Sequence, residues 1–184
     1  DGDGDLDLAV TLKNSNQVTL LRNDGPFVFT MASTVATGGS EPRAMVAADM
    51  DGDGDPDFVA ANRDSDSVTV ILNQGGTLAF AGTFAAGTDP RDVAAADFNG
   101  DGRTDVAVSS HDTRQIILLN GAGGGSLVAG GTFGVPVNTR PEGLAAGDIN
   151  GDGDMDLGAG TGDHNNVAMN FASVYANNGG APAG

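Results

Sequence analysis

The sequence contains no cysteine and no tryptophan, and aromatic residues make up only 5% of its 184 residues. Without cysteine the chain has no disulfide bond and no thiolate zinc site. Basic residues are few, 8 against 25 acidic ones, which gives a formal net charge of −17. Only one lysine occurs, Lys13, and no basic patch is visible, which argues against nucleic acid as a partner. No apolar run is long enough for a membrane-spanning helix.

Aspartate and glycine are abundant instead, and they come together in the stretch Asp49–Asp57. Counted from Asp49, carboxylates stand at positions one, three, five, seven and nine, and Gly54 stands at position six. Oxygen ligands at alternate positions, with a glycine that permits a sharp turn, are typical of the front half of a calcium-binding loop. Five carboxylates so close together would repel one another strongly without a cation.

The same pattern recurs at Asp97–Asp105 and Asp148–Asp156, and incompletely at Asp1–Asp7. Asp-Gly and Asn-Gly pairs are also common in plain hairpin turns. A turn needs only one such pair, however, whereas four loops in register with acids at alternate positions favour calcium binding. Most of the 25 acidic residues lie in these loops, so the negative charge is local and bound divalent ions would offset much of it.

The loops begin about 50 residues apart, a period typical of propellers and solenoids. A proline stands seven residues before each complete loop, at Pro42, Pro90 and Pro141. These landmarks divide a single repeat domain, residues 1–184, into units of approximately 1–39, 40–88, 89–138 and 139–184.

Each unit contains short runs of Val, Ile, Leu, Phe and Thr separated by turn residues, which predicts a small antiparallel meander. No segment has a sustained helical period with caps. In the second unit the expected strands are Ala44–Ala48, Asp57–Ala61, Val68–Leu72 and Leu78–Ala85. The first unit lacks its opening strand. The last has an insertion at Thr161–Ala172, a third strand at Ser173–Ala176 and no fourth. We therefore predict an all-β fold of four-stranded β-propeller blades, fourteen strands in about three and a half blades.

The pattern Pro-x₆-Asp-x-(Asp/Asn)-Gly-Asp-Gly-x-x-Asp resembles the FG-GAP and VCBS repeats, which occur in the propeller of integrin α-subunits and in many secreted bacterial proteins. The resemblance covers almost the whole chain and implies calcium bound in the loop between the first two strands of each blade. The implied side-chain ligands are Asp49, Asp51, Asp53 and Asp57, then Asp97, Asn99, Asp101 and Asp105, then Asp148, Asn150, Asp152 and Asp156. Asp55, Arg103 and Asp154 would contribute backbone carbonyls, and Asp1, Asp3, Asp5 and Asp7 would form the incomplete fourth site.

Other candidates for chemistry are weaker. Ser109–Asp112 contains the residue types of a hydrolase triad, but sequence neighbours on a strand end are expected to diverge, and a turn histidine is the expectation. Gly121–Ser126 resembles a phosphate loop without the following helix that such a loop requires. Arg43 and Arg91 follow the repeat prolines and are expected to pair with loop carboxylates. His164 lies in the insertion and is expected to be a solvated loop residue.

These observations favour an extracellular, calcium-stabilised, non-catalytic propeller module for adhesion or scaffolding. The missing strands suggest two alternatives, a self-assembling subunit of a fibril or surface layer, or part of a longer chain whose remaining blades complete the propeller. A third alternative is a fragment of a carbohydrate-active or carbohydrate-binding propeller protein. The shortage of aromatic platforms argues against a strong lectin. The expected partners are other protein chains or further blades, with carbohydrate as a further candidate.

Overall fold

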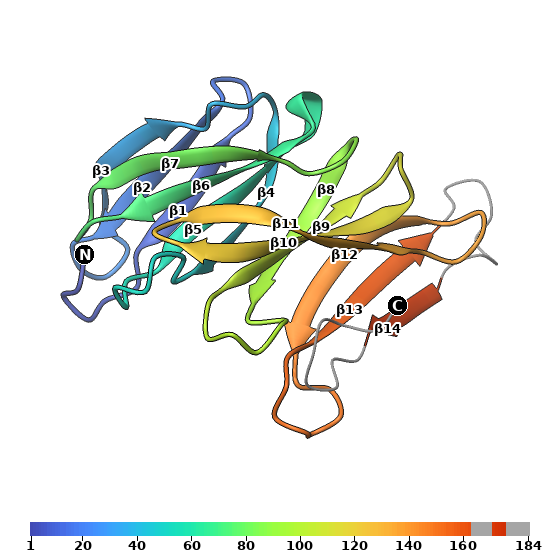
Figure 1. Cartoon of the computed structure of the whole chain (residues 1–184). Helices are drawn as coiled ribbons and strands as arrows, with labels where there is room; N and C mark the ends of the chain where they lie inside the picture. Colours follow the sequence, from blue (N-terminus) through green and yellow to red (C-terminus); the bar gives the residue numbers. More distant parts are fainter. Residues whose placement is uncertain (163–170, 176–184) are drawn as a thin grey trace.

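The computed structural model describes residues 1–162 and 171–175, which form an all-β fold of four antiparallel sheets (Figure 1). The first sheet contains β1 (Leu8–Leu12), β2 (Gln17–Asn23) and β3 (Phe29–Ala36). The second contains β4 (Pro42–Ala48), β5 (Asp57–Asn62), β6 (Ser67–Asn73) and β7 (Leu78–Ala85). The third contains β8 (Pro90–Ala96), β9 (Asp105–Ser110), β10 (Gln115–Gly123) and β11 (Ser126–Gly134). The fourth contains β12 (Arg140–Gly147), β13 (Asp156–Gly162) and β14 (Phe171–Tyr175).

Within every sheet the strands lie side by side in chain order, as in the blade of a propeller. The predicted fold class is therefore confirmed, and each sequence unit contains one sheet. The described residues contain fourteen strands, as expected, and the first sheet lacks a strand before β1. The one helical element in the described residues is the 3-10 turn η1 (Arg63–Ser65), and nothing helical there could serve as a transmembrane span.

The last sheet differs from the sequence prediction in its boundaries. Thr161 belongs to β13, and β14 begins at Phe171, so both flanks of the expected insertion are strand. The predicted third strand, Ser173–Ala176, is thus displaced by two residues at its start, and its last residue lies outside the described residues. His164 and the chain after Tyr175, where a fourth strand was expected to be absent, also lie outside the described residues.

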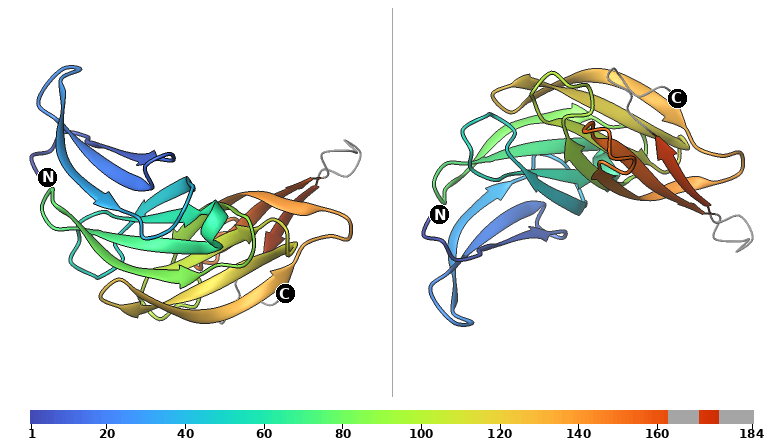
Figure 2. Two further views of the ribbon diagram at one scale, coloured as in Figure 1. Left: turned by 90° about the horizontal axis from the view of Figure 1, so that it is seen from above. Right: turned by 90° about the horizontal axis from the view of Figure 1, so that it is seen from below.

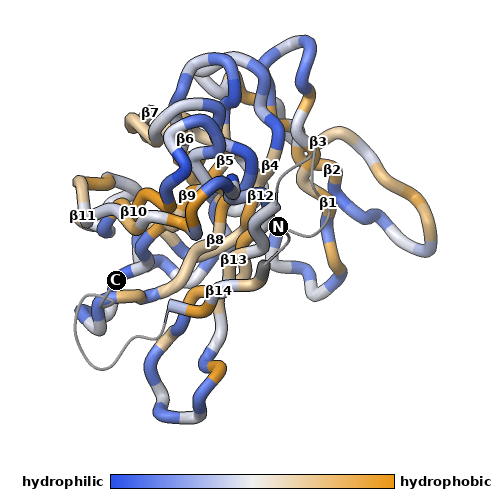
Figure 3. The backbone as a smooth tube through the Cα atoms, turned by 90° about the vertical axis from the view of Figure 1, so that its right-hand side faces the viewer, coloured by the Kyte–Doolittle hydropathy of each residue, from blue (hydrophilic) through white to orange (hydrophobic). Residues whose placement is uncertain are grey.

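Three hydrophobic clusters hold successive sheets together. All six residues of β5 are buried, because its alternating side chains face two neighbouring sheets. Phe58 packs with Val18 and Leu20 of the first sheet, whereas Val59 packs with Val106 of the third. A third cluster joins the third and fourth sheets through Ile116, Leu118, Phe133, Leu157 and Ala159. The hydrophobic strand segments accordingly meet in the interior in Figure 3.

The inner strands of the blades lie next to one another, with β4 in contact with β8 and β8 in contact with β12. The four sheets follow each other along an open arc, and the first and fourth sheets lie at its two ends (Figure 2). Pairing of each inner strand is irregular close to its proline, as between Pro42 and Ala44 and between Pro90 and Val93. A proline has no N–H to donate to a sheet, which explains why the regular ladder begins after it.

Candidate metal centres

The acidic loops lie on one face of the arc, at the lower side of Figure 1. Three of them connect the first and second strands of a sheet, namely β4 to β5, β8 to β9 and β12 to β13, and Asp1–Asp7 precedes β1. Strand topology therefore brings together four segments that are far apart in the sequence.

Backbone N–H groups hold each complete loop in the same conformation. Both carboxylate oxygens of Asp49 accept hydrogen bonds, from the N–H of Gly52 at 2.7 Å and of Gly54 at 3.0 Å. Asp53 Oδ1 accepts from the N–H of Asp55 at 2.8 Å. The third and fourth loops repeat these contacts at Asp97, Gly100 and Gly102, and at Asp148, Gly151 and Gly153. The identical folding of separate loops explains the identical spacing of their aspartates.

The two glycines of each loop have a backbone conformation that other residues adopt at a cost. In the second sheet's loop φ is +90° at Gly52 and +94° at Gly54, and the equivalent glycines of the other loops are similar. Residues with a Cβ are disfavoured there. The two repeated glycines of each loop are thus a requirement of the loop backbone.

The aspartate at position nine is the buried anchor of each complete loop. Asp57 is fully buried, and its two carboxylate oxygens accept the N–H groups of Met50 at 2.9 Å and Asn73 at 2.8 Å. Asp105 binds the N–H groups of Phe98 and Gly121 in the same way, at 3.1 and 2.8 Å. The anchor therefore ties the start of the loop to the end of the third strand.

Burial has an electrostatic cost at these anchors. Desolvation raises the pKa of Asp57, and the nearby charges of Asp51 and Asp53 raise it further, against the opposing effect of its two backbone hydrogen bonds. Burial likewise raises the pKa of Asp105, with added repulsion from Asp101 and Asp97. A cation between these carboxylates would relieve the repulsion.

The structure brings together Asp49, Asp51 and Asp57, each with an oxygen within 4.8 Å of the others. Carboxylate oxygens with this spacing fit a hard cation such as Ca²⁺. Asp53 and Asp55 lie in the same loop, and the predicted ligands of the third and fourth sheets lie in the equivalent loops of those sheets. In the first loop Asp7 binds the N–H of Asn23 at 2.9 Å, as the other anchors bind the third strand. The ligand set predicted from the sequence therefore stays a prediction that the loop geometry supports.

We expect the position-nine aspartate to stabilise the fold even without metal. Asp105→Ala removes the buried carboxylate that accepts from the N–H groups of Phe98 and Gly121, which should lower the unfolding free energy by about 2–4 kcal/mol. The measurement is urea unfolding at low temperature in chelator, where loss of metal binding does not contribute. Asp101→Ala is the matched control, since its exposed carboxylate accepts one local bond, from the N–H of Arg103. Equal destabilisation by the two substitutions would contradict the anchor role.

The structure also places the weaker candidates. Arg91 donates to Asp89 at 2.8 Å, a carboxylate in the connection before β8, as expected of a nearby loop carboxylate, whereas Arg43 is exposed. His111 lies in the turn between β9 and β10, as expected, but it is buried. Its neighbour Asp112 does not diverge from it, since Nδ1 of His111 lies 2.9 Å from Asp112 Oδ1.

The remaining candidates take part in the structure of the third sheet. Ser109 Oγ accepts the N–H of Asp92 at 2.8 Å and lies 3.3 Å from the carbonyl oxygen of Glu142. Gly121–Ser126 covers the end of β10, a turn at Gly124 and Gly125, and the first residue of β11.

Comparison with known proteins agrees with the fold. A family model described as FG-GAP-like repeat matches residues 1–60, 49–108 and 97–159. A candidate 6-phosphogluconolactonase from Bacteroides uniformis is 14% identical, with a TM-score of 0.61 over 90% of this chain and 52% of its own. BBS1N, solved in complex with ARL6DN, is 15% identical, with a TM-score of 0.60 over 86% of this chain and 47% of its own.

A functionally unknown protein from Desulfotomaculum acetoxidans is 18% identical, with a TM-score of 0.52 over 67% of this chain and 37% of its own. The chain thus spans between 37% and 52% of the length of these solved proteins, and at such low identity the likeness concerns the fold alone. No curated protein matches the sequence.

Proposed function

Because the chain belongs to the FG-GAP-like repeat family, we propose that it is an extracellular, calcium-stabilised propeller module that acts in adhesion or scaffolding rather than in catalysis. The observation that carries the proposal is the repeated acidic loop, whose first aspartate accepts the same backbone contacts in three sheets and whose carboxylates converge in the second sheet. Asp49, Asp51 and Asp57, with the carbonyl of Asp55, would hold the ion in the second sheet. Calcium there would supply charge compensation and a rigid cross-link within the loop.

An extracellular location agrees with this chemistry. Acidic loops that bind calcium are found in extracellular modules. A scaffold function needs only a rigid surface, and the sheets and loops of this fold supply one. Carbohydrate remains a candidate ligand, for which the described residues offer few aromatic side chains on the loop face.

We predict three tight calcium sites and a weaker first one. Titration calorimetry of the 184-residue chain should resolve the three complete loops, whereas the first loop, Asp1–Asp7, lacks its position-one aspartate and should bind more weakly. Four equivalent sites would show that the missing ligand comes from elsewhere.

Two substitutions in one loop test which groups are ligands. Asp49→Ala removes a side-chain ligand, so the number of tight sites should fall from three to two. Asp55→Asn removes the same charge at position seven, where only the backbone carbonyl is expected to bind, and should leave three. Arg103 occupies position seven in the third sheet, which supports this expectation. Equal losses from the two substitutions would mean that net charge, and not coordination, determines binding.

A second candidate function is self-assembly, which the end faces of the arc favour. The outward face of the first sheet exposes Leu8, Val10 and Met31, whose side chains are 46%, 38% and 72% exposed. The outward face of the fourth sheet is nearly flat, with Gly158, Gly160 and Ala172 beside Val174. Within the arc, faces of this kind pack on one another at each junction of sheets. A second copy that docks head to tail would bury both faces in the same manner.

A further inference from the structure

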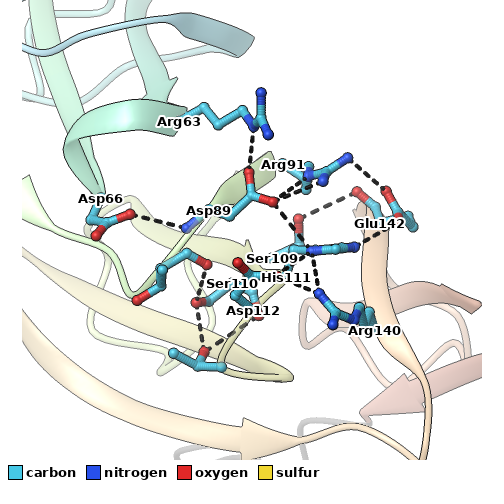
Figure 4. Close-up of polar contacts among 12 residues, drawn as sticks. Arg63, Asp66, Asp89, Arg91, Ser109, Ser110, His111, Asp112, Arg140 and Glu142 are labelled. Carbon is cyan, nitrogen blue, oxygen red and sulfur yellow. Dashed lines mark hydrogen bonds and ion pairs between the residues drawn. The ribbon is translucent and has the colours of Figure 1, made fainter. Parts of the chain in front are cut away.

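Charged side chains form a continuous series on the face opposite the acidic loops, where the inner strands begin. Arg63 of η1 donates from Nε to Asp89 Oδ1 at 2.7 Å and lies 3.3 Å from Glu41 Oε1. Glu41 in turn pairs with Lys13 of the first sheet. Asp89 also accepts from Arg91 of β8, as Figure 4 shows. The series therefore crosses from the first sheet to the third.

The series ends at His111, which is surrounded by carboxylates from two sheets. Its side chain is only 6% exposed. On one side Nδ1 lies 2.9 Å from Oδ1 of Asp112, in the turn after β9. It also lies 3.2 Å from Oδ2 of Asp89, in the connection that enters β8 of the same sheet. On the other side Nε2 lies 3.2 Å from Oε1 of Glu142, which belongs to β12 of the fourth sheet. The imidazole therefore bridges the two sheets (Figure 4).

The proton count of the ring determines whether this bridge is complete. A neutral imidazole carries one N–H, so either tautomer turns one nitrogen lone pair toward a carboxylate oxygen. Only the imidazolium pairs with carboxylates on both sides, through the hydrogen bond of Nδ1 with Asp112 and an ion pair of Nε2 with Glu142. Burial alone would raise the pKa of Asp89. The hydrogen bonds that Asp89 accepts from Arg91 and Arg63 outweigh this effect and hold its pKa below the ordinary value, so its carboxylate stays charged.

Basic groups also face this site. Arg140 of β12 contacts Asp112 and places Nη1 3.2 Å from His111 Nδ1, and the exposed Arg114 lies in the same turn as His111. When Nδ1 is deprotonated, Arg140 can donate to it, so the site has two hydrogen-bond arrangements that differ by one proton. We propose that His111 is a proton-sensitive joint between the third and fourth sheets, closed when both ring nitrogens are protonated and weakened when one proton is lost.

The same groups lie close enough together to hold a metal ion, since Asp89, His111 and Asp112 each offer an atom within 4.8 Å of the others. The oxygens that would bind it are already engaged by guanidinium groups, Asp89 Oδ2 by Arg91 and Asp112 Oδ1 by Arg140. Two adjacent positive charges disfavour a further cation. A proton on the ring fits the site better.

Thermal unfolding in saturating calcium tests the joint between about pH 6 and pH 8, a window in which imidazole titrates and ordinary carboxylates do not. The closed state binds the extra proton, so its stability is present at the lower pH and is lost as the pH rises. We expect the melting temperature to fall by about 3 °C across this window. His111→Gln keeps a donor but cannot become charged, and its melting temperature should be constant. His164→Gln changes the only other histidine of the chain and should behave as the unmodified protein does.

Nitrogen NMR of the two histidine rings gives an independent readout that does not depend on a variant that folds. We expect His111 to be protonated on both nitrogens when the joint is closed, and to lose one proton in the range where the melting temperature falls. A melting temperature independent of pH in the unmodified chain would overturn the proposal. So would a pH dependence that persists in His111→Gln, or loss of the ring proton without change in stability.

Discussion

Addition of EDTA should lower the melting temperature of this protein by about 20 °C, and Ca²⁺ should restore it far better than Mg²⁺. The reason is that clustered carboxylates such as Asp49, Asp51 and Asp57 are stable together only when a cation offsets their repulsion. The free energy of metal binding then becomes free energy of folding. Mg²⁺ requires a tighter octahedral geometry and releases its water reluctantly, so it is the matched divalent control.

The size of the effect follows from the number of loops. A site held at one hundred times its dissociation constant contributes about 2.7 kcal/mol, so three sites contribute roughly 8 kcal/mol. For a chain of this length each kcal/mol moves the melting temperature by about 2–4 °C. An unchanged melting curve in chelator would refute structural calcium binding. Sodium chloride at equal ionic strength separates screening of the carboxylates from true coordination.

The stability of the metal-free protein should also depend on pH in a defined direction. Because the pKa values of buried Asp57 and Asp105 are raised above 3.8, the folded state binds these protons more tightly than the unfolded state does. The metal-free protein therefore gains stability from these groups as the pH falls from neutral toward the ordinary carboxyl range. With calcium bound this gain should vanish, since protons and the cation compete for the same oxygens.

Much of the fold was predictable because its information is local. Alternation of apolar residues set the strands, and glycines at positive φ, such as Gly52 and Gly54, marked loops whose backbone excludes other residues. The anchor role of Asp57 was not visible in the spacing, because it depends on the N–H of Asn73, sixteen residues away in another strand. The spacing identified Asp57 as a candidate ligand, but only the structure shows that it is buried.

The charged series was missed for a related reason. Several of its members stand next to the repeat prolines, such as Glu41 before Pro42 and Asp89 before Pro90, which is a signal that the repeat alignment contains. In the fourth unit the charges are exchanged, with Arg140 before the proline and Glu142 after it. When the units are aligned, the fourth unit therefore carries the opposite charge at each of these two positions. Across the junction between the third and fourth sheets, these opposite charges are complementary. Glu142 and Arg140 contact His111 only because the fourth sheet packs on the third, and the sequence alone does not show this packing.

In calcium, we expect the 184-residue chain to associate at micromolar concentration through its two end faces. The outward side chains Leu8, Val10 and Met31 are apolar and exposed, and a charge buried between them and a second copy would cost several kcal/mol. Val10→Asp in the first sheet or Val174→Asp in the fourth should therefore weaken association about 100-fold, as measured by sedimentation. Val137→Asp is the matched control, because that valine is 84% exposed in the connection before β12.

A mixture of the two end-face variants distinguishes the mode of contact. In a head-to-tail arrangement the Val10→Asp chain keeps an intact fourth sheet, and the Val174→Asp chain keeps an intact first sheet. The mixture should then form a one-to-one dimer that cannot grow, although neither variant associates alone, because each copy has one altered face. A symmetric contact would not be restored by mixing. A compact monomer at every concentration of the unmodified chain would rule out assembly through these faces and leave the calcium loops as the basis of its function.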